Sequence, residues 1–226
     1  MTNLSNKDKY LVVYNSFQAL GWYYLIISMI MRFLFQGTSS IFTTFMSLGS
    51  IVCTLQVVAF LEILHVYFGL VKSGSIMPTI FQVFGRNHVL LWALCYVYPA
   101  QEHWSVFLMC ATWGVSELIR YPYYIASTLN ECPKFLEWLR YNAFIVLYPL
   151  GFAAENILWY QMLPIILARK IHFLIMPNSY NFSFNYYYFA LVWIISTLLL
   201  FPQQYLYMFS LRKKKMSNTV PKKKTQ

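Results

Sequence analysis

The chain has 226 residues, of which 59% are hydrophobic, 20% aromatic and only 11% charged. In a soluble domain about a quarter of the residues are charged, so the composition excludes that class and indicates a membrane protein. The formal net charge of +10 does not indicate nucleic-acid binding, because the basic C-terminal segment RKKKMSNTVPKKKTQ directly follows an apolar segment and contains no aromatic residue. Attraction to anionic lipid headgroups explains this segment.

Six apolar segments are long enough to cross about 30 Å of hydrocarbon. They are residues 10–31, 47–71, 79–99, 104–128, 138–163 and 186–209. The first has no small-residue cleavage site after a short apolar core, so we expect a retained anchor and not a signal peptide. The third contains Arg86, Asn87 and His88 in its first half, and its uninterrupted apolar part begins at Val89. The sequence thus predicts an all-α membrane protein, a bundle of six transmembrane helices.

The Lys and Arg residues between these segments predict the orientation. If both termini are cytoplasmic, the opposite side carries only Arg32, Arg169 and Lys170. The positive-inside rule therefore favours two cytoplasmic termini. We divide the chain into a transmembrane domain, residues 1–211, and a basic cytoplasmic tail, residues 212–226. The terminal KKTQ resembles the dilysine signal that returns membrane proteins to the endoplasmic reticulum, although a lysine-rich tail also ends this way by chance.

Ionisable residues inside a span are candidates for function, because each is costly in hydrocarbon. In the second span, Glu62 and His65 stand three positions apart and project from one helix face. An E-x-x-H pair is typical of di-iron bundles, but those need a second copy, which this sequence lacks. The four cysteines form no C-x-x-C pair either. We therefore expect no metal, and expect Glu62 and His65 to form a hydrogen-bonded structural pair or to have a secondary role in a pocket.

In the fourth span, the stretch SELIRYPYY places Glu117, Arg120, Tyr121 and Tyr124 on one helix face. Glu117 and Arg120 can neutralise each other so that the helix inserts. Arg120 can also tune a neighbouring group or bind an anionic or carbonyl group, since its guanidinium is always charged. The two roles are compatible.

The fifth span, YNAFIVLYPLGFAAENILWY, carries Glu155, although an ionised carboxyl at this depth costs about 2.5–3.5 kcal/mol on insertion scales. Tyr148 lies two turns earlier on the same face, about 10 Å away along the axis. Pro149 frees a backbone carbonyl between them, and Gly151 leaves room for a substrate. A phenol and a carboxyl that face one gap form a general acid–base arrangement. With nineteen tyrosines in the chain, the spacing also arises easily by chance.

The same residues carry a resemblance to a known family. YNAFIVLYPLGFAAE is similar to the core motif of the very-long-chain (3R)-3-hydroxyacyl-CoA dehydratases, also called the protein tyrosine phosphatase-like or PASTICCINO-type family. Further similar segments extend over nearly the whole chain: YLVVYNSFQALGW, LQVVAFLEILHVYFGLVKS, QVFGR, WGVSELIRYPYY, LPIILARK, MPNSYNFSFNYYYF and LFPQQYLYMF. The chain departs from the family pattern at Asn185, where an acidic residue is expected, but this position lies away from the core motif.

The resemblance implies an enzyme of the endoplasmic reticulum membrane with six spans. Such an enzyme removes water from a 3-hydroxyacyl-CoA and forms trans-2-enoyl-CoA, the third step of the fatty acid elongation cycle. The family's catalytic Tyr and Glu, in the pattern Y-P-x-G-x-x-x-E, fall on Tyr148 and Glu155. The expected partners are the acyl-CoA substrate and the elongase and reductase enzymes of the cycle, and we expect no cofactor.

Dehydration requires one base and one acid, and two assignments are open. In the first, Glu155 takes the C2 proton or passes it to the departing hydroxyl, while Tyr148 hydrogen-bonds to that hydroxyl or to the thioester oxygen. Burial favours the neutral form of a carboxyl, which suits Glu155 as the acid. In this second assignment Tyr148 is the base, and a cation such as Arg120 must stabilise its phenolate.

The substrate has an apolar and a charged end. A long acyl chain is expected among apolar helices, where each buried CH₂ contributes about 0.8 kcal/mol. The CoA phosphates are expected at the cytoplasmic surface, where the candidate clamps are Lys72, Arg86, Lys134 and Arg140. Each of these residues also obeys the positive-inside rule without any role in binding.

Two other functions compete with catalysis. An inactive family member would serve as a membrane scaffold or signalling adaptor, but it need not retain both Tyr148 and Glu155. A transporter with a proton relay through Glu117 and Glu155 would be expected to have inverted repeats or broken helices in both halves, and the sequence shows neither.

Overall fold

The computed structural model describes residues 4–71 and 76–219, with side chains described as far as Lys215. Most of these residues are helical, and an isolated β-bridge joins Leu174 to Phe184. The elements are α1 (Asn6–Gln36), α2 (Ser39–Phe42), α3 (Thr44–Val58), α4 (Phe60–Tyr67), α5 (Met77–Asn87), the π-helix η1 (His88–Leu94), α6 (Tyr98–Gln101), α7 (Trp104–Thr128), α8 (Lys134–Asn142), α9 (Phe144–Arg169) and α10 (Tyr186–Thr219). The predicted all-α class is confirmed, while Lys72 and the terminal KKTQ lie outside the described residues.

Four stretches of helix are long and apolar enough to cross a membrane. They are α1, the α3–α4 stretch, α9, and α10 as far as Lys215. The chain is therefore built as a multi-pass membrane protein. Of the two remaining predicted spans, residues 104–128 form the single helix α7, whereas residues 79–99 are divided among α5, η1 and α6.

The predicted bounds of the fifth span, residues 138–163, are wrong. The residues before Ala143 belong to the separate helix α8, and α9 runs from Phe144 to Arg169. The sequence of α8, KFLEWLRYN, mixes charged and apolar residues and therefore does not continue the apolar helix that follows it. The carboxyl of Glu137 on α8 pairs with Lys215 of α10 at 2.9 Å. Helix α10 thus continues into the first part of the predicted tail and packs beside α8.

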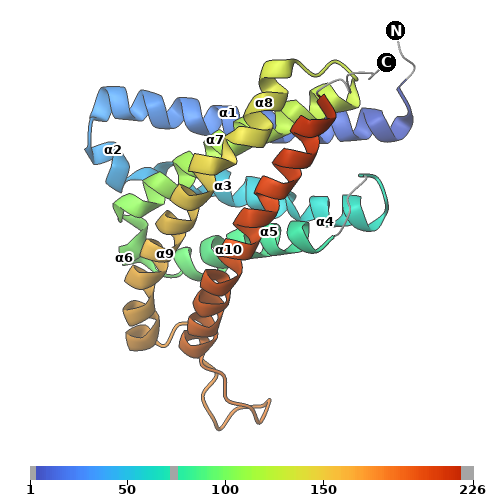
Figure 1. The fold of residues 1–226 in the computed structure, drawn as a ribbon. Helices are drawn as coiled ribbons and strands as arrows, with labels where there is room; N and C mark the ends of the chain where they lie inside the picture. The colour runs from blue at the N-terminus through green and yellow to red at the C-terminus, as the bar shows by residue number, and fades with distance from the viewer. Residues whose placement is uncertain (1–3, 72–75, 220–226) are drawn as a thin grey trace, which may run out of the picture.

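Helix α7 lies at the centre of the bundle, with α1 against one side and α9 against the other (Figure 1). Gly114 permits the close approach to α1, because a methyl group at this position would lie 2.5 Å from Cδ1 of Ile26. The core around α7 consists of large side chains from several helices that are almost fully buried, among them Trp22, Leu25, Leu90, Leu94, Met109, Leu158 and Met162. This packing fixes the direction in which α7 turns the face that carries Glu117 and Arg120.

Helices α9 and α10 are antiparallel and pack through rows of aromatic rings. The rings on α9 recur every four residues, and so do the rings on α10 that they meet. The contacts join Phe144 to Tyr205 and Phe209, Tyr148 to Phe201 and Tyr205, and Phe152 to Phe201. Because residues four apart lie on one helix face, these rings form a continuous seam. The seam sets the position of α10 relative to Tyr148.

Candidate active site

Glu155 lies where α9 packs on α7. It is partly buried, and its Oε1 accepts a hydrogen bond from the indole Nε1 of Trp113 at 2.9 Å. Gly151, one turn earlier, is buried against α7, where an added methyl group would lie 3.4 Å from Oγ1 of Thr112. Thr112 and Trp113 therefore occupy the space that the sequence analysis assigned to a substrate beside Gly151. The glycine instead lets α9 approach α7.

Tyr148 faces α10 and is held on two sides. Its hydroxyl donates a hydrogen bond to Oε1 of Gln204 at 2.8 Å. Its ring stacks on Phe201, with ring centres 5.2 Å apart and planes 4° apart, and on Tyr205, with centres 6.0 Å and planes 12° apart. A phenol constrained at both ring and hydroxyl is oriented before a substrate binds.

No hydrogen bond joins Tyr148 to Glu155 within the described part of the chain. The phenol bonds to α10 and the carboxyl bonds to α7. Each group is therefore held separately, Glu155 by Trp113 of α7 and Tyr148 by Gln204 of α10.

A second polar group lies deeper in the bundle and consists of Glu62, Arg86, Glu117 and Arg120, here called the four-charge network. Nε of Arg120 lies 2.6 Å from the Glu117 carboxylate, and Nη2 of the same guanidinium lies 2.7 Å from the Glu62 carboxylate. Arg86 pairs with the other oxygen of Glu117. The predicted pairing of Glu117 with Arg120 is confirmed. The network is balanced, because it contains two carboxylates and two guanidinium groups.

Tyrosines complete the bonding around Glu62 and His65. The Tyr121 hydroxyl donates to the Glu62 carboxylate at 2.6 Å, and the Tyr14 hydroxyl lies 3.4 Å from the same oxygen. His65 is buried and bonds to the Tyr10 hydroxyl at 2.9 Å. The proposed hydrogen bond between Glu62 and His65 is therefore absent, since each group bonds to residues of other helices. No group of three or more His, Cys, Asp or Glu side chains within the described ranges could hold a metal ion.

Trp113 links the four-charge network to Glu155. The Arg86 guanidinium lies over the Trp113 ring, 5.1 Å from its centre, in a cation–π contact. The indole N–H of the same ring points to Glu155. Trp113 was not recognised from the sequence, although it precedes Glu117 by one helical turn and therefore lies on the polar face of α7. Gln204 was also missed, although an amide inside an apolar span was a signal.

The predicted phosphate clamps occupy different environments. Lys134 is exposed at the start of α8. Arg140 of α8 lies beside Tyr124, with Nη2 3.4 Å from the phenol oxygen. Arg86 is different, because its guanidinium is turned toward buried Glu117 inside the bundle. Phosphate binding stays a prediction for Lys134 and Arg140, while the charge of Arg86 is already paired.

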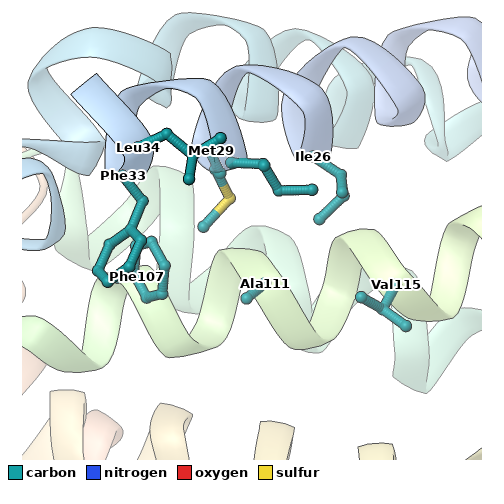
Figure 2. A pocket seen from close by; sticks show the side chains of 8 residues that line it. Ile26, Met29, Phe33, Leu34, Phe107, Ala111 and Val115 are labelled. Atoms are coloured by element: carbon teal, nitrogen blue, oxygen red, sulfur yellow. The ribbon is translucent and has the colours of Figure 1, made fainter. Parts of the chain in front are cut away.

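Two apolar hollows lie on the flanks of α1. One, of about 280 Å³, lies between α1 and α7, and Figure 2 shows its side chains from both helices, among them Phe33, Phe107 and Val115. The other, of about 300 Å³, lies between α1 and α3 and includes Phe17. Neither hollow is lined by Tyr148 or Glu155. They add apolar surface to the bundle but are separate from the candidate active site.

The chain is similar to known proteins over most of its length. The sequence model of the protein tyrosine phosphatase-like protein family, PTPLA, matches residues 56–218. A human protein (Homo sapiens) named very-long-chain (3R)-3-hydroxyacyl-CoA dehydratase 2 is 38% identical over 216 residues, which cover 95% of this chain and 84% of the human protein. A mouse protein (Mus musculus) named very-long-chain (3R)-3-hydroxyacyl-CoA dehydratase 1 is 35% identical over 93% of this chain and 74% of its own length.

A chicken protein (Gallus gallus) named very-long-chain (3R)-3-hydroxyacyl-CoA dehydratase is 34% identical over 96% of this chain and 59% of its own length. No solved structure matches the chain. The resemblance inferred from the sequence motifs is thus confirmed by a family match and by relatives aligned over most of the chain. The chain belongs to the protein tyrosine phosphatase-like family, PTPLA.

Proposed function

We propose that this chain dehydrates very-long-chain (3R)-3-hydroxyacyl-CoA to trans-2-enoyl-CoA, the third step of fatty acid elongation. Relatives named for this dehydratase activity align with 93–96% of the chain. The proposal rests on the bonding of Glu155. This carboxyl belongs to no ion pair in the described part of the chain, whereas Glu62 and Glu117 are both paired with arginines. An unpaired carboxyl and an oriented phenol, two turns apart on one helix, supply the two groups that acid–base catalysis needs.

The reaction breaks a C–H bond at C2 and a C–O bond at C3, and forms the C2–C3 double bond and water. The C2 proton needs an acceptor and the departing hydroxide needs a proton. We assign Glu155 to take the C2 proton and to pass it to the departing oxygen. Its Oε1 is held by Trp113, and Oε2 accepts no hydrogen bond within the described residues. Tyr148 then hydrogen-bonds to the leaving hydroxyl or to the thioester oxygen.

The bonding of Arg120 supports this assignment over its opposite. A Tyr148 base would need a cation to stabilise the phenolate. Arg120, the cation considered for this task, instead bonds to Glu117, Glu62 and the Tyr121 hydroxyl. Within the described residues Arg120 makes no hydrogen bond to Tyr148, whose hydroxyl partner is the neutral amide of Gln204.

We also propose six membrane crossings with both termini on the cytoplasmic side. In this topology the four long apolar stretches each cross once. The other two crossings are made by α5 together with η1, and by α7. Nζ of Lys7 donates to the carbonyl of Gly69 at 3.2 Å, which brings the start of α1 beside the end of α4. His172, between α9 and α10, bonds to the carbonyl of Trp92 at 2.9 Å and so lies beside the end of η1. These contacts support helices that alternate in direction.

The setting that fits this activity is the endoplasmic reticulum membrane, with elongase and reductase enzymes of the cycle as partners. The basic residues that follow residue 211 would face anionic headgroups of the cytoplasmic leaflet. Lys134 and Arg140, on the adjacent helix α8, are candidates to hold the CoA phosphates there.

The test is the conversion of 3-hydroxypalmitoyl-CoA to its 2-enoyl product by the purified full chain in lipid vesicles. Tyr148→Phe and Glu155→Gln remove the two reactive groups and should each lower the rate by about a hundredfold or more. Tyr160→Phe changes an exposed tyrosine of the same helix, and Glu102→Gln changes an exposed glutamate. Both control variants should match the parent.

Activity of the parent with loss in both site variants would support the dehydratase. A parent that is inactive on short and long 3-hydroxyacyl-CoA substrates alike would contradict it, and a scaffold or adaptor of the same fold would then account for the chain. Parent activity that survives in either site variant would leave the reaction in place and remove that residue from the mechanism.

A further inference from the structure

The segment FPQQY of α10 brings a third polar side chain to Tyr148. Two adjacent glutamines here lie in different surroundings: Gln203 is exposed, whereas Gln204 is partly buried and faces α9. Oε1 of Gln204 accepts the hydrogen bond of the Tyr148 hydroxyl at 2.8 Å. A polar group in an apolar region is costly unless it is hydrogen-bonded, so this bond satisfies the amide oxygen and selects its direction.

The next residue, Tyr205, anchors the same segment to the backbone of α9. Pro149 has no N–H, so the carbonyl four residues before it loses its helical donor. That carbonyl belongs to Ile145, and the Tyr205 hydroxyl donates to it at 2.9 Å. Tyr205 also stacks on Tyr148. Two neighbouring residues of α10 therefore bind α9 near the phenol. Gln204 accepts the hydrogen bond of the Tyr148 hydroxyl, and Tyr205 donates one to the freed carbonyl.

We infer that Gln204 is a positioning residue for Tyr148 in the proposed dehydration, an inference that rests on the proposed function. A phenol has one proton to donate. While that proton is directed to Gln204, the phenol oxygen is fixed in place and its lone pairs are left for another donor. When the leaving hydroxyl arrives, the O–H turns from Gln204 to it, and the two stacked rings keep the phenol oxygen in the position that the Gln204 bond had set.

This role affects the chemical step more than substrate binding. A misplaced reactive group lowers kcat, because the geometry needed in the transition state is populated less often. An interaction that serves only the transition state lowers kcat and leaves KM nearly constant. Gln204 acts through the phenol, so its loss should follow this pattern.

The test uses purified full chain in lipid vesicles and 3-hydroxypalmitoyl-CoA at varied concentration. Gln204→Asn keeps the amide but shortens its reach by one CH₂, so it should lower kcat by about tenfold and change KM by less than about twofold. Gln203→Asn is the matched control in the same segment and should match the parent. Gln204→Leu removes the acceptor oxygen without adding a charge, so it should lower kcat at least as much as Gln204→Asn.

The inference is overturned if Gln204→Asn behaves like Gln203→Asn, or if it changes KM alone. It is also overturned if Gln204→Leu keeps the parent kcat, because the acceptor oxygen would then be irrelevant. An inactive parent would instead overturn the proposed function and, with it, any role of Gln204 in that reaction. The parent rate therefore separates the two failures.

Discussion

The four-charge network and the Tyr148–Glu155 pair are both polar groups inside an apolar bundle, but they are bonded in opposite ways. In the network every carboxylate faces an arginine, and Glu117 is fully buried between two of them. Among the described residues, Glu155 accepts only the N–H of a neutral indole and belongs to no ion pair. Tyr148 likewise bonds to a neutral amide.

This difference distinguishes charged groups that stabilise the fold from groups that can take part in a reaction. A buried charge that is paired can remain as part of the fold, since its partner offsets the loss of water. A carboxyl that lacks such a partner keeps the capacity to gain and lose a proton during a reaction. We therefore expect substitutions in the network to change stability first, and substitutions in the pair to change the reaction rate first.

The largest expected effect is that of Glu155→Gln on the reaction. The variant keeps the shape and a carbonyl oxygen for the Trp113 bond but removes the proton acceptor, so kcat should fall by about 10²–10⁴-fold. Thermal unfolding in detergent, followed by tryptophan fluorescence, should match that of the parent. A clear fall in the unfolding temperature would place Glu155 with the structural network instead.

Glu117→Gln should produce the opposite result. It leaves Arg86 and Arg120 with Glu62 as their remaining carboxylate in the network, and an uncompensated buried charge costs about 3–5 kcal/mol. The measurement is the free energy of unfolding in detergent. Adding Arg86→Gln to Glu117→Gln restores a balanced pair and should recover part of the loss. Equal stability of the single and double variants would show that charge balance is not what the network provides.

Trp113→Phe tests the link between the two groups. The substitution keeps an aromatic ring beneath Arg86 but removes the N–H that orients Glu155, and hydrogen bonds to charged groups contribute about 1.5–3 kcal/mol. We expect kcat to fall by about tenfold with little change in protein yield. Trp138→Phe, at an exposed tryptophan of α8, is the matched control. Equal rates of the two variants would remove Trp113 from the site.

Tyr205→Phe should have the smallest effect. It keeps the ring stacked on Tyr148 and removes only the bond to the Ile145 carbonyl, which is worth about 1 kcal/mol of stability. The expected readout is a small fall in the unfolding temperature with a rate loss of a few fold. Tyr207→Phe, an exposed neighbour, should change neither value. A loss as large as that of Glu155→Gln would mean that Tyr205 itself takes part in the reaction.

The sequence predicted contacts that depend on helical spacing and missed those that depend on tertiary packing. Glu117 and Arg120 are three residues apart, so their pairing follows from the helix alone. The bonds from Trp113 to Glu155 and from Tyr148 to Gln204 join residues 42 and 56 positions apart. No helical period relates such positions, and the many aromatic residues offer several alternative partners.

Helix bounds were also predicted only where the local sequence marks them. The bounds of α7 were predicted correctly, because a polar turn precedes the apolar helix and Thr128 is followed by a polar loop. The start of α9 was not, because Trp138, Leu139 and Tyr141 made the amphipathic helix α8 look like part of the apolar segment. The spacing of seven residues predicted that Tyr148 and Glu155 share one helix face. It could not show that Tyr148 bonds to α10 and Glu155 to α7.

The most direct test of the account is the rate of enoyl-CoA formation per folded molecule for Glu155→Gln and Glu117→Gln, measured side by side in vesicles. The account predicts that folded Glu117→Gln protein retains the parent rate to within about tenfold, while Glu155→Gln loses about a hundredfold or more. Folded Glu155→Gln protein that dehydrates 3-hydroxypalmitoyl-CoA at the parent rate would contradict it.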